Sequence, residues 1–357
     1  MSHRIMIIAG GTGGHVYPAL AVARYLLGQG ARVDWLGTEH GLEHRVVTEH
    51  GIPLHIVRVS GVRGHGLVRL CQAPFMILRA LFESVRILRR ESPAVVLGMG
   101  GFVSGPGGIA AWLLRIPLCI HEQNAIPGLT NRLLRPFARV VMQAFPGTFG
   151  TGVPTPGNPV REDILAVLPP EQRMRPDKTA INILVIGGSL GAARLNRVVP
   201  QALATLGNEV QCSVRHQAGP RHLEDTRAAY RECRVEAEVI DFIDDMAGAY
   251  AWADLVICRA GAMTIAELAA VGIGSILVPF PYAVDDHQTA NARYLSDSGC
   301  AVLVPESELD AGKLADVILD LCHSRERLLE MAKTCRGLAK PRATEEVAML
   351  CLEVACA

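Results

Sequence analysis

A chain of 357 residues is too long for one ordinary hydrophobic core and suits two α/β domains. Half of its residues are hydrophobic, only 5% are aromatic and 35 are glycine, which favours parallel sheets with tight turns over a sandwich or a disordered chain. The net charge is zero, but residues 1–160 carry 15 arginines against seven acidic residues, leaving 20 basic against 28 acidic residues in the remainder. A basic first half suits lipid headgroups, a diphosphate or nucleic acid, unless its arginines are simply scattered and solvated.

The ten cysteines include no C-x-x-C pair and no Cys/His cluster at metal spacing, and most lie in apolar runs. This pattern predicts reduced core thiols in a cytosolic protein. The apolar run after Arg4 is too short for a signal-peptide core. Glycine and proline interrupt the uncharged stretches at 95–114 and 268–284, so we expect no transmembrane span.

The first distinctive stretch is Ile5 to Pro18, which reads I-M-I-I-A-G-G-T-G-G-H-V-Y-P. It predicts a strand, a tight glycine turn and the start of a helix, where free backbone N–H groups favour a phosphate or diphosphate. Residues 183–192 repeat this design as I-L-V-I-G-G-S-L-G-A. Each half of the chain therefore begins with a turn of the phosphate-binding type.

An α/β alternation follows the first turn, and a loop is predicted over 61–66. The expected elements are a helix over 16–27, a strand over 33–36, a helix over 43–49 and a strand over 54–59.

A helix predicted over 74–90 is apolar over more than one stripe and carries arginines on another face. Such a helix can lie in the headgroup layer of an anionic membrane, or it can pack on the sheet as an ordinary layer helix; both readings stay open. The residues assigned to the membrane surface are Phe75, Leu78, Arg79, Leu81, Phe82 and Arg86.

Two further segments of the first half are predicted at sheet edges. A strand over 94–98 runs into the uncharged glycine turn 99–108, which suits either a phosphate or packing alone. A strand over 118–121 ends in H-E-Q-N at 121–124, where an open sheet meets its ligands. A last strand over 140–143 precedes a predicted linker, the Pro/Gly-rich segment 146–159.

The second half predicts another parallel sheet with helices in the gaps. Its strands are expected at 181–186, 210–214, 235–240, 254–257, 275–279 and 301–304, and its last helices at about 308–338 and 343–356. Two glycine turns and polar strand ends describe a nucleotide-diphosphate site in which helix dipoles, N–H groups and Arg161 neutralise a leaving diphosphate. The chain contains no D-x-D and no clustered histidine ligands, so no metal is expected.

The ordered set of motifs resembles the MurG family of UDP-N-acetylglucosamine transferases over the whole chain. The matching motifs are G-G-T-G-G-H at 10–15, G-G-F-V-S-G-P at 100–106, H-E-Q-N at 121–124, G-N-P-V-R at 157–161, G-G-S-L-G-A at 187–192, the segment 259–267 and D-H-Q at 286–288. Leu190 departs from the polar residue frequent in the family and leaves the glycine framework intact.

The resemblance implies a GT-B fold, with two Rossmann-like doubly wound domains facing a deep cleft. It places an acceptor domain at 1–159, completed by a C-terminal helix at about 342–357, and a donor domain at 160–341. The implied reaction is inverting transfer from UDP-N-acetylglucosamine to the muramyl C4 hydroxyl of an undecaprenyl-diphosphate-linked muramyl-pentapeptide, in peptidoglycan synthesis. The implied location is the cytoplasmic face of the bacterial inner membrane, on anionic lipids, with no nucleic acid and no bound cofactor.

The resemblance also implies roles for individual residues. Ile243 would meet uracil through its backbone, and Glu267 would bind the ribose. Asn124 and Gln288 would bind the sugar hydroxyls. Amides and carboxylates suit hydroxyls because they supply complementary donors and acceptors. The donor set is completed by Thr12, Gly13, Gly14, Arg161, Ser189, Gly191, Ala262, Met263 and Thr264. The acceptor diphosphate would lie at Gly11, Gly13, Gly14, Gly101, Ser104 and Gly105.

The reaction needs a base near the attacking hydroxyl. His15 is the first candidate because histidine can accept a proton near neutral pH and because it stands at a helix start, and Glu122 is the substitute. His15 can instead bind phosphate or structure the turn.

Three rival functions remain on the sequence. A UDP-N-acetylglucosamine 2-epimerase shares the architecture but takes no lipid acceptor. An NAD-dependent dehydrogenase is disfavoured because G-G-T-G-G is not G-x-G-x-x-G. A nucleotide-sensing membrane scaffold has no specific feature in its favour.

Overall fold

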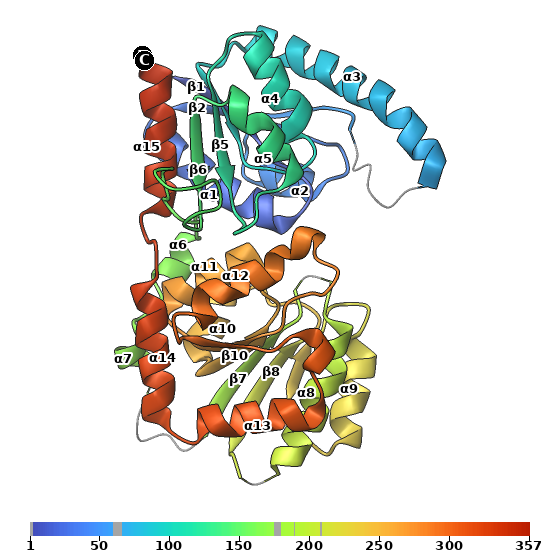
Figure 1. Ribbon diagram of the computed structural model, residues 1–357, viewed down its shortest axis with the longest axis vertical. Coiled ribbons are helices and arrows are strands. Elements are labelled where there is room, and N and C mark those ends of the chain that lie inside the picture. The colour runs from blue at the N-terminus through green and yellow to red at the C-terminus, as the bar shows by residue number, and fades with distance from the viewer. Residues whose placement is uncertain (1–2, 60–65, 175–179, 189, 208) are drawn as a thin grey trace. The chain divides into compact units, whose positions relative to one another are not determined.

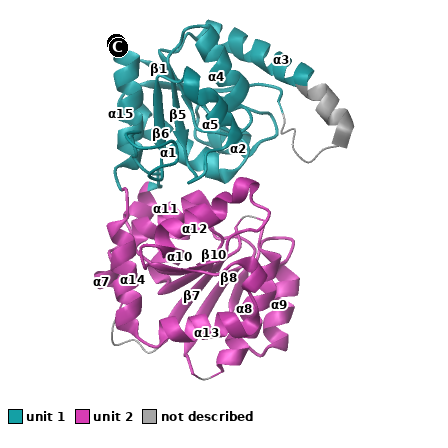
Figure 2. Ribbon diagram, in the orientation of Figure 1, with its two compact units in different colours: residues 1–161, 341–357 teal, residues 162–340 magenta. Residues whose placement is uncertain are grey.

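The structure is a computed structural model that describes residues 3–59, 66–174, 180–188, 190–207 and 209–357 (Figure 1). It divides into two compact units: Met1–Arg161 together with Pro341–Ala357, and Glu162–Lys340 (Figure 2). The chain thus completes the second unit before its last segment returns to the first. The loop expected over 61–66 lies, apart from Gly66, outside the described residues.

The first unit is built on a six-stranded sheet with the order β3-β2-β1-β4-β5-β6, in which every pairing is parallel. The strands are β1 Arg4–Ile8, β2 Arg32–Gly37, β3 Leu54–Ile56, β4 Val95–Gly98, β5 Leu118–Glu122 and β6 Val140–Gln143. The strand predicted over 54–59 ends at Ile56, because only this short stretch pairs with β2.

Side chains of β1 alternate between two hydrophobic layers, as the period of two in a strand requires. Ile5 and Ile7 pack with α1, α2 and α15, whereas Met6 and Ile8 pack with α3, α4 and α5. Burial on both faces explains the unbroken apolar runs in the sequence. The helices are α1 Gly13–Gly28, α2 Leu42–Glu49, α3 Gly66–Glu91, α4 Ser104–Leu113, α5 Leu129–Leu134 and α15 Ala343–Cys356, with a short 3-10 turn at Arg135–Phe137.

The second unit repeats the plan with a parallel sheet of order β12-β11-β10-β7-β8-β9. Counted along the chain, its strands follow the same order as those of the first unit. The strands are β7 Ile181–Ile186, β8 Cys212–Gln217, β9 Glu238–Ile240, β10 Leu255–Cys258, β11 Gly274–Leu277 and β12 Ala301–Leu303.

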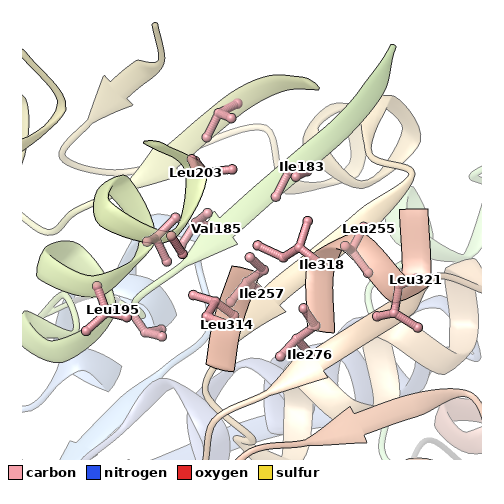
Figure 3. Close-up of a cluster of buried hydrophobic side chains, with 14 of the residues drawn as sticks. Ile183, Val185, Leu195, Leu203, Leu255, Ile257, Ile276, Leu314, Ile318 and Leu321 are labelled. Carbon is pink, nitrogen blue, oxygen red and sulfur yellow. The ribbon is translucent and has the colours of Figure 1, made fainter. Parts of the chain in front are cut away.

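The core of the second unit joins the central strands to α8 and α13. In Figure 3, Val185 and Ile257 of neighbouring strands lie among Leu195 of α8 and Leu314 and Ile318 of α13, all in one buried cluster. The helices are α6 Glu162–Leu165, α7 Pro170–Arg173, α8 Ala193–Leu206, α9 Leu223–Glu232, α10 Met246–Trp252, α11 Ala262–Val271, α12 His287–Ser296, α13 Ala311–Cys322 and α14 Arg325–Gly337, with 3-10 turns at Val284–Asp286 and Glu306–Glu308.

Each sheet reverses its strand order at one point, between β1 and β4 in the first unit and between β7 and β10 in the second. The register pairs Ile8 with Gly98, and Ile186 with Cys258. The turns that follow these paired strand ends therefore lie side by side, at the place where open α/β sheets bind ligands.

The segment predicted as a linker, 146–159, is part of the first unit. Residues 156–160 are buried, and two hydrogen bonds attach the segment to β6: Gln143 N–H donates to Pro154 O over 3.0 Å, and Phe149 N–H donates to Gln143 Oε1 over 2.7 Å. The linker prediction was wrong because a Pro/Gly-rich composition indicates turns and does not show whether the turns pack. The nine cysteines that the structure describes with side chains are free thiols, five of them buried.

Candidate active site

The first glycine turn connects β1 to α1. Thr12 takes the N-cap position in extended backbone, and Gly13 and Gly14 are the first residues of the helix. The N–H groups of these first helical residues have no partner within the helix, so they are available to an anion. The neighbouring turn after β4 approaches very closely, since a Cβ on Gly101 would lie 2.2 Å from Gly10 O. Only glycine fits there.

A buried carboxylate that the sequence did not reveal fixes this turn. Glu43 of α2 accepts hydrogen bonds from Gly11 N–H over 3.1 Å, Thr38 N–H over 2.9 Å and the Thr38 hydroxyl over 2.6 Å. A Cβ on Gly10 would lie 2.7 Å from Glu43 Oε1. The Gly11 amide is therefore engaged inside the protein, unlike those of Gly13 and Gly14. No local pattern marks Glu43, because its partners come from two other loops.

The predicted residues of the β4 turn differ in accessibility. Gly101 and Gly105 are half-buried, whereas Ser104 is fully buried. The Ser104 hydroxyl lies 2.7 Å from Gly100 O and 3.1 Å from Ile8 O, so it joins the turn to β1.

His15 lies in the first turn of α1 and is half-buried. Its Nδ1 is 3.0 Å from Gln123 Oε1. Gly100 makes room for the ring, because a Cβ there would lie 2.7 Å from His15 Nδ1 and 2.8 Å from Cε1. Gly100 also has a φ of +92°, a conformation that other residues rarely adopt. The turn after β4 thus leaves room for the imidazole ring of His15 because position 100 is glycine.

Behind His15 a chain of hydrogen bonds runs into the protein. Gln123 Nε2 lies 3.1 Å from His121 Nδ1, and His121 Nε2 lies 2.8 Å from Gly157 O. His121 is fully buried, and this burial lowers its pKa from 6.5 to about 4. The H-E-Q-N motif thus places His121 and Gln123 in contact with one another and Gln123 in contact with His15.

Glu122 points into a different cluster. Its Oε1 accepts from Asn124 N–H over 3.0 Å and from Asn124 Nδ2 over 3.2 Å, and its Oε2 accepts from Gly128 N–H over 3.0 Å and from Asn131 Nδ2 over 2.9 Å. The side chain is almost completely buried. Four donors occupy both oxygens, so the carboxylate shapes the turn that carries Asn124. Asn124 and Arg161, both half-buried, complete the predicted residues of this unit.

In the second unit the turn after β7 is held by close backbone contact. Gly191 has a φ of +77°, and a Cβ on it would lie 2.0 Å from Ala218 O in the turn after β8. Ser189, predicted to meet the diphosphate, lies outside the described residues. Leu190 is exposed.

The turn after β10 presents the start of α11. Gly261 takes the N-cap position in extended backbone, and Ala262, Met263 and Thr264 form the first helical turn, where the helix dipole favours an anion. One turn further along, Glu267 Oε2 accepts a hydrogen bond from the Tyr250 hydroxyl over 3.0 Å. Ile243, predicted to meet uracil through its backbone, is buried.

Gln288, in the first turn of α12, is oriented by the loop before it. Its Oε1 accepts from Phe280 N–H over 2.9 Å. Arg259, which the sequence did not single out, attaches this loop: its guanidinium donates to Val278 O and to Pro279 O, each over 3.1 Å, and forms an ion pair with Glu306. Asp285 and Asp286 both have positive φ, so the backbone just before α12 is strained.

One group of potential metal ligands occurs among the described residues. Ligand atoms of Asp34, His55 and Glu91 lie within 4.8 Å of one another. Arg4 forms ion pairs with both carboxylates, at 3.3 Å to Asp34 and 2.7 Å to Glu91. The carboxylates are thus already paired, and the group reads as an ion-pair network that joins β1, β2, β3 and the end of α3.

The helix α3 presents an apolar surface together with its arginines, and Figure 1 shows it beside α4. Phe75, Leu78 and Phe82 are 79%, 64% and 70% exposed, and Arg79 and Arg86 are also exposed. Leu81 differs, because it is half-buried and packs against the core. The sequence prediction missed further exposed apolar residues on α4 and α5: Trp112, Leu113, Leu129 and Leu133. No helix among the described residues is long and apolar enough to cross a membrane.

Comparison with known proteins gives matches over nearly the whole chain. The glycosyltransferase family 28 N-terminal domain matches residues 5–143, and the family 28 C-terminal domain matches residues 182–347. A UDP-N-acetylglucosamine--N-acetylmuramyl-(pentapeptide) pyrophosphoryl-undecaprenol N-acetylglucosamine transferase from Marinobacter nauticus is 53% identical over 354 residues, which are 99% of this chain and 98% of that protein. A protein of the same name from Nitrosococcus oceani is 53% identical over 357 residues, 99% of each chain.

Among solved structures, the crystal structure of Acinetobacter baumannii MurG is similar with a TM-score of 0.87 and 44% identity, covering 98% of this chain and 99% of that one. Together with the two parallel sheets, each flanked by helices, these matches confirm the predicted GT-B fold class. The chain belongs to glycosyltransferase family 28 and, within it, to the MurG family.

Proposed function

We propose that the chain transfers N-acetylglucosamine from UDP-N-acetylglucosamine to the muramyl C4 hydroxyl of undecaprenyl-diphosphate-linked muramyl-pentapeptide, with inversion at the anomeric carbon, in peptidoglycan synthesis. The observation that carries this proposal is the identity of 53% over 99% of the chain to a curated transferase of that name. The alternative of a UDP-N-acetylglucosamine 2-epimerase is not favoured, because relatives at this identity are transferases.

The donor nucleotide is assigned to the second unit. The start of α11, with Met263 and Thr264 in its first turn, offers N–H groups and a helix dipole to the diphosphate, supported by the Gly191 turn. Glu267 suits the ribose diol as an acceptor, and Tyr250 holds one of its oxygens in place. Because Gln288 Oε1 is bound to Phe280 N–H, its amide NH₂ is the group left to meet a sugar hydroxyl.

The acceptor diphosphate is assigned to the paired glycine turns of the first unit. The N–H groups of Gly13 and Gly14, at the start of α1, and the half-buried turn at Gly101 and Gly105 supply its donors. Gly11 and Ser104 take structural roles in this scheme, because the Gly11 amide donates to Glu43 and the Ser104 hydroxyl lies against two carbonyl groups.

His15 is the proposed base. Its Nε2 takes the proton of the C4 hydroxyl as that oxygen attacks the anomeric carbon, and the bond from this carbon to the UDP oxygen breaks on the opposite face. The departing negative charge is met by the N–H groups of α11 and by Arg161. We prefer His15 to Glu122, since four hydrogen-bond donors already occupy both oxygens of Glu122.

The deciding assay measures UDP release from UDP-N-acetylglucosamine with and without the polyprenyl-diphosphate muramyl acceptor. We expect release that depends on the acceptor and a disaccharide-linked lipid product. Release of UDP at the same rate without the acceptor, or conversion of the donor to its 2-epimer, would contradict the transferase assignment.

We also propose that α3, α4 and α5 dock the protein on the cytoplasmic face of an anionic inner membrane, where the lipid acceptor resides. The support is the exposed apolar set Phe75, Leu78 and Phe82 next to Arg79 and Arg86. Apolar side chains enter the acyl boundary while each basic group near an anionic surface contributes about 1 kcal/mol.

Replacing Phe75, Leu78 and Phe82 together by Ser should lower sedimentation with phosphatidylglycerol vesicles at least about tenfold, because three exposed apolar side chains no longer enter the bilayer. The matched control replaces Ile56, Leu168 and Met349, which are also exposed and apolar, by Ser. Equal sedimentation of the two triple variants would contradict the docking surface.

A further inference from the structure

The hydrogen-bond chain behind His15 has a direction, and a backbone carbonyl sets it. Gly157 O lies 2.8 Å from His121 Nε2. A carbonyl oxygen can only accept, so Nε2 of His121 must carry a proton. The chain therefore starts from a fixed donor deep in the first unit.

The next link follows because His121 is neutral. Full burial lowers its pKa to about 4, so at neutral pH the ring has a single proton, already placed on Nε2. Nδ1 of His121 must then accept, and the group of Gln123 that faces it at 3.1 Å must be the amide NH₂. A second carbonyl agrees, since His121 O lies 3.3 Å from the same Gln123 nitrogen.

The orientation of Gln123 then determines the tautomer of His15. With its NH₂ turned to His121, Gln123 presents Oε1 to His15 Nδ1 at 3.0 Å. An amide oxygen cannot donate, so His15 Nδ1 carries the proton and the lone pair of the neutral ring is on Nε2. The reversed amide would leave His121 Nε2 facing Gly157 O as two acceptors, which is unfavourable in a buried site.

We propose that Gln123 and His121 are positioning residues that set the tautomer of His15, so that Nε2 of His15 is the proton acceptor in the transfer reaction. This inference rests on the proposed function of His15 as the base. When Nε2 takes the hydroxyl proton, the imidazolium keeps its Nδ1–H bond to Gln123 Oε1, and the proton passes to water after the product leaves. Asn158 adds support, because its Nδ2 donates to Gln123 O over 3.0 Å and holds the backbone of the relay.

The direct test is histidine-selective ¹⁵N NMR of the full chain at a pH above 7, because ¹⁵N chemical shifts separate protonated from unprotonated ring nitrogens. His15→Ala and His121→Gln identify the two residues by the loss of their signals. We expect His15 with a protonated Nδ1 and an unprotonated Nε2, and His121 with the opposite tautomer. Observation of His15 with its proton on Nε2 would overturn the inference.

The kinetic test replaces the amide by an apolar side chain of similar length. Gln123→Met should lower kcat at least about tenfold, with KM for the donor changed less than twofold, because the base loses its tautomer and not its ligand. The matched control is Gln143→Met. Gln143 is also buried, and it lies opposite Glu122 in the register of β5 and β6. Its side chain forms hydrogen bonds with Phe149, Gly150 and Thr155 of the segment that follows β6.

A loss of kcat no greater in Gln123→Met than in Gln143→Met would overturn the inference, since a merely structural role moves both alike. The proposed function fails separately: if His15→Ala keeps the wild-type kcat, His15 is not the base, whatever tautomer the NMR spectrum shows. A tautomer as predicted together with a selective loss in Gln123→Met would support both.

Discussion

Each unit contains a fully buried histidine bonded to a side-chain amide, and the two clusters differ in where their hydrogen bonds end. In the second unit, Nε2 of His216 lies 3.0 Å from Asn196 Oδ1 and Nδ1 lies 2.9 Å from the Tyr230 hydroxyl. Asn196 Nδ2 donates to Ala218 O over 2.8 Å. All members of this cluster are buried, whereas the cluster of His121 leads to the half-buried His15.

The difference separates two uses of one chemical arrangement. Burial lowers the pKa of His216 to about 3 and that of His121 to about 4, so both rings are neutral connectors at neutral pH. The closed cluster of His216 joins β8 to α8 and α9 and contributes to stability. The open cluster of His121 ends at His15, which is half-buried and is the proposed base. Mutations should therefore affect stability in one unit and turnover in the other.

The largest effect is expected at the open end of the first cluster. His15→Ala removes the proposed base and should lower kcat by roughly 100-fold or more while donor affinity changes little. Steady-state kinetics together with donor binding by calorimetry measures the two quantities. An equal loss of donor binding would show that His15 positions the substrate instead.

A smaller loss of turnover is expected from Gly100→Ala, because the new Cβ would lie 2.7 Å from His15 Nδ1. We expect kcat to fall by about 10-fold to 100-fold as the ring is displaced. Gly147→Ala is the matched control: Gly147 has a similar φ of +86°, and nothing lies within 4 Å of its Cβ position. Both variants carry the backbone strain of roughly 1–3 kcal/mol, so only the clash distinguishes their kcat values.

A substitution in the closed cluster of His216 should lower the stability of the protein. His216→Ala leaves the Tyr230 hydroxyl and Asn196 Oδ1 without their partner and opens a cavity, which should lower the free energy of unfolding by about 2–4 kcal/mol. Urea unfolding measures this loss, with the exposed Ser213→Ala on the same strand as the control. A kcat of the folded protein below that of the control would contradict the division between the clusters.

Lowering the pH should produce the smallest of these effects, a decrease in the free energy of unfolding. Both buried histidines have a folded-state pKa below 6.5, so the unfolded chain binds more protons and stability falls as the pH drops below 6.5, down to about 4 for His121 and about 3 for His216. At pH 5.5 each histidine should cost about 1 kcal/mol relative to pH 7.5. Urea unfolding at both pH values measures the change. His216→Ala should lose about half of this dependence; an unchanged dependence would show that other groups cause it.

Local patterns predicted the two sheets and both switch-point turns. Apolar runs followed by glycine indicate strands buried on both faces and tight turns, so β7 was predicted at its observed bounds, Ile181–Ile186. The helix α15 was also predicted at its observed bounds, Ala343–Cys356. His15 was predicted at a helix start for the same reason. Weak edge strands were predicted less well: β3 and β9 are three residues each, shorter than predicted, because pairing with a single neighbour decides which residues belong to the strand.

The partners of the site residues could not be predicted in this way. Gly157 is 36 residues from His121, and Gln123 is 108 residues from His15, so their contacts exist only after the sheet has formed. Glu43 reads in the sequence as an ordinary acidic residue at a helix start, yet its carboxylate is fully buried against Gly11 and Thr38. The linker prediction at 146–159 failed in the same way, since hydrogen bonds to distant residues turn that segment into part of the first unit.

The position of α15 has a consequence for how the protein is made. Val347, Ala348 and Cys351 belong to the same buried cluster as Ile5 and Ile7 at the other end of the chain. During synthesis from the N-terminus, the first unit therefore lacks its last helix until residues 343–356 have been made, while the second unit has all of its residues earlier. A nascent chain with an incomplete first unit exposes that apolar layer, so premature termination after Lys340 should yield a folded second unit attached to an aggregation-prone first unit.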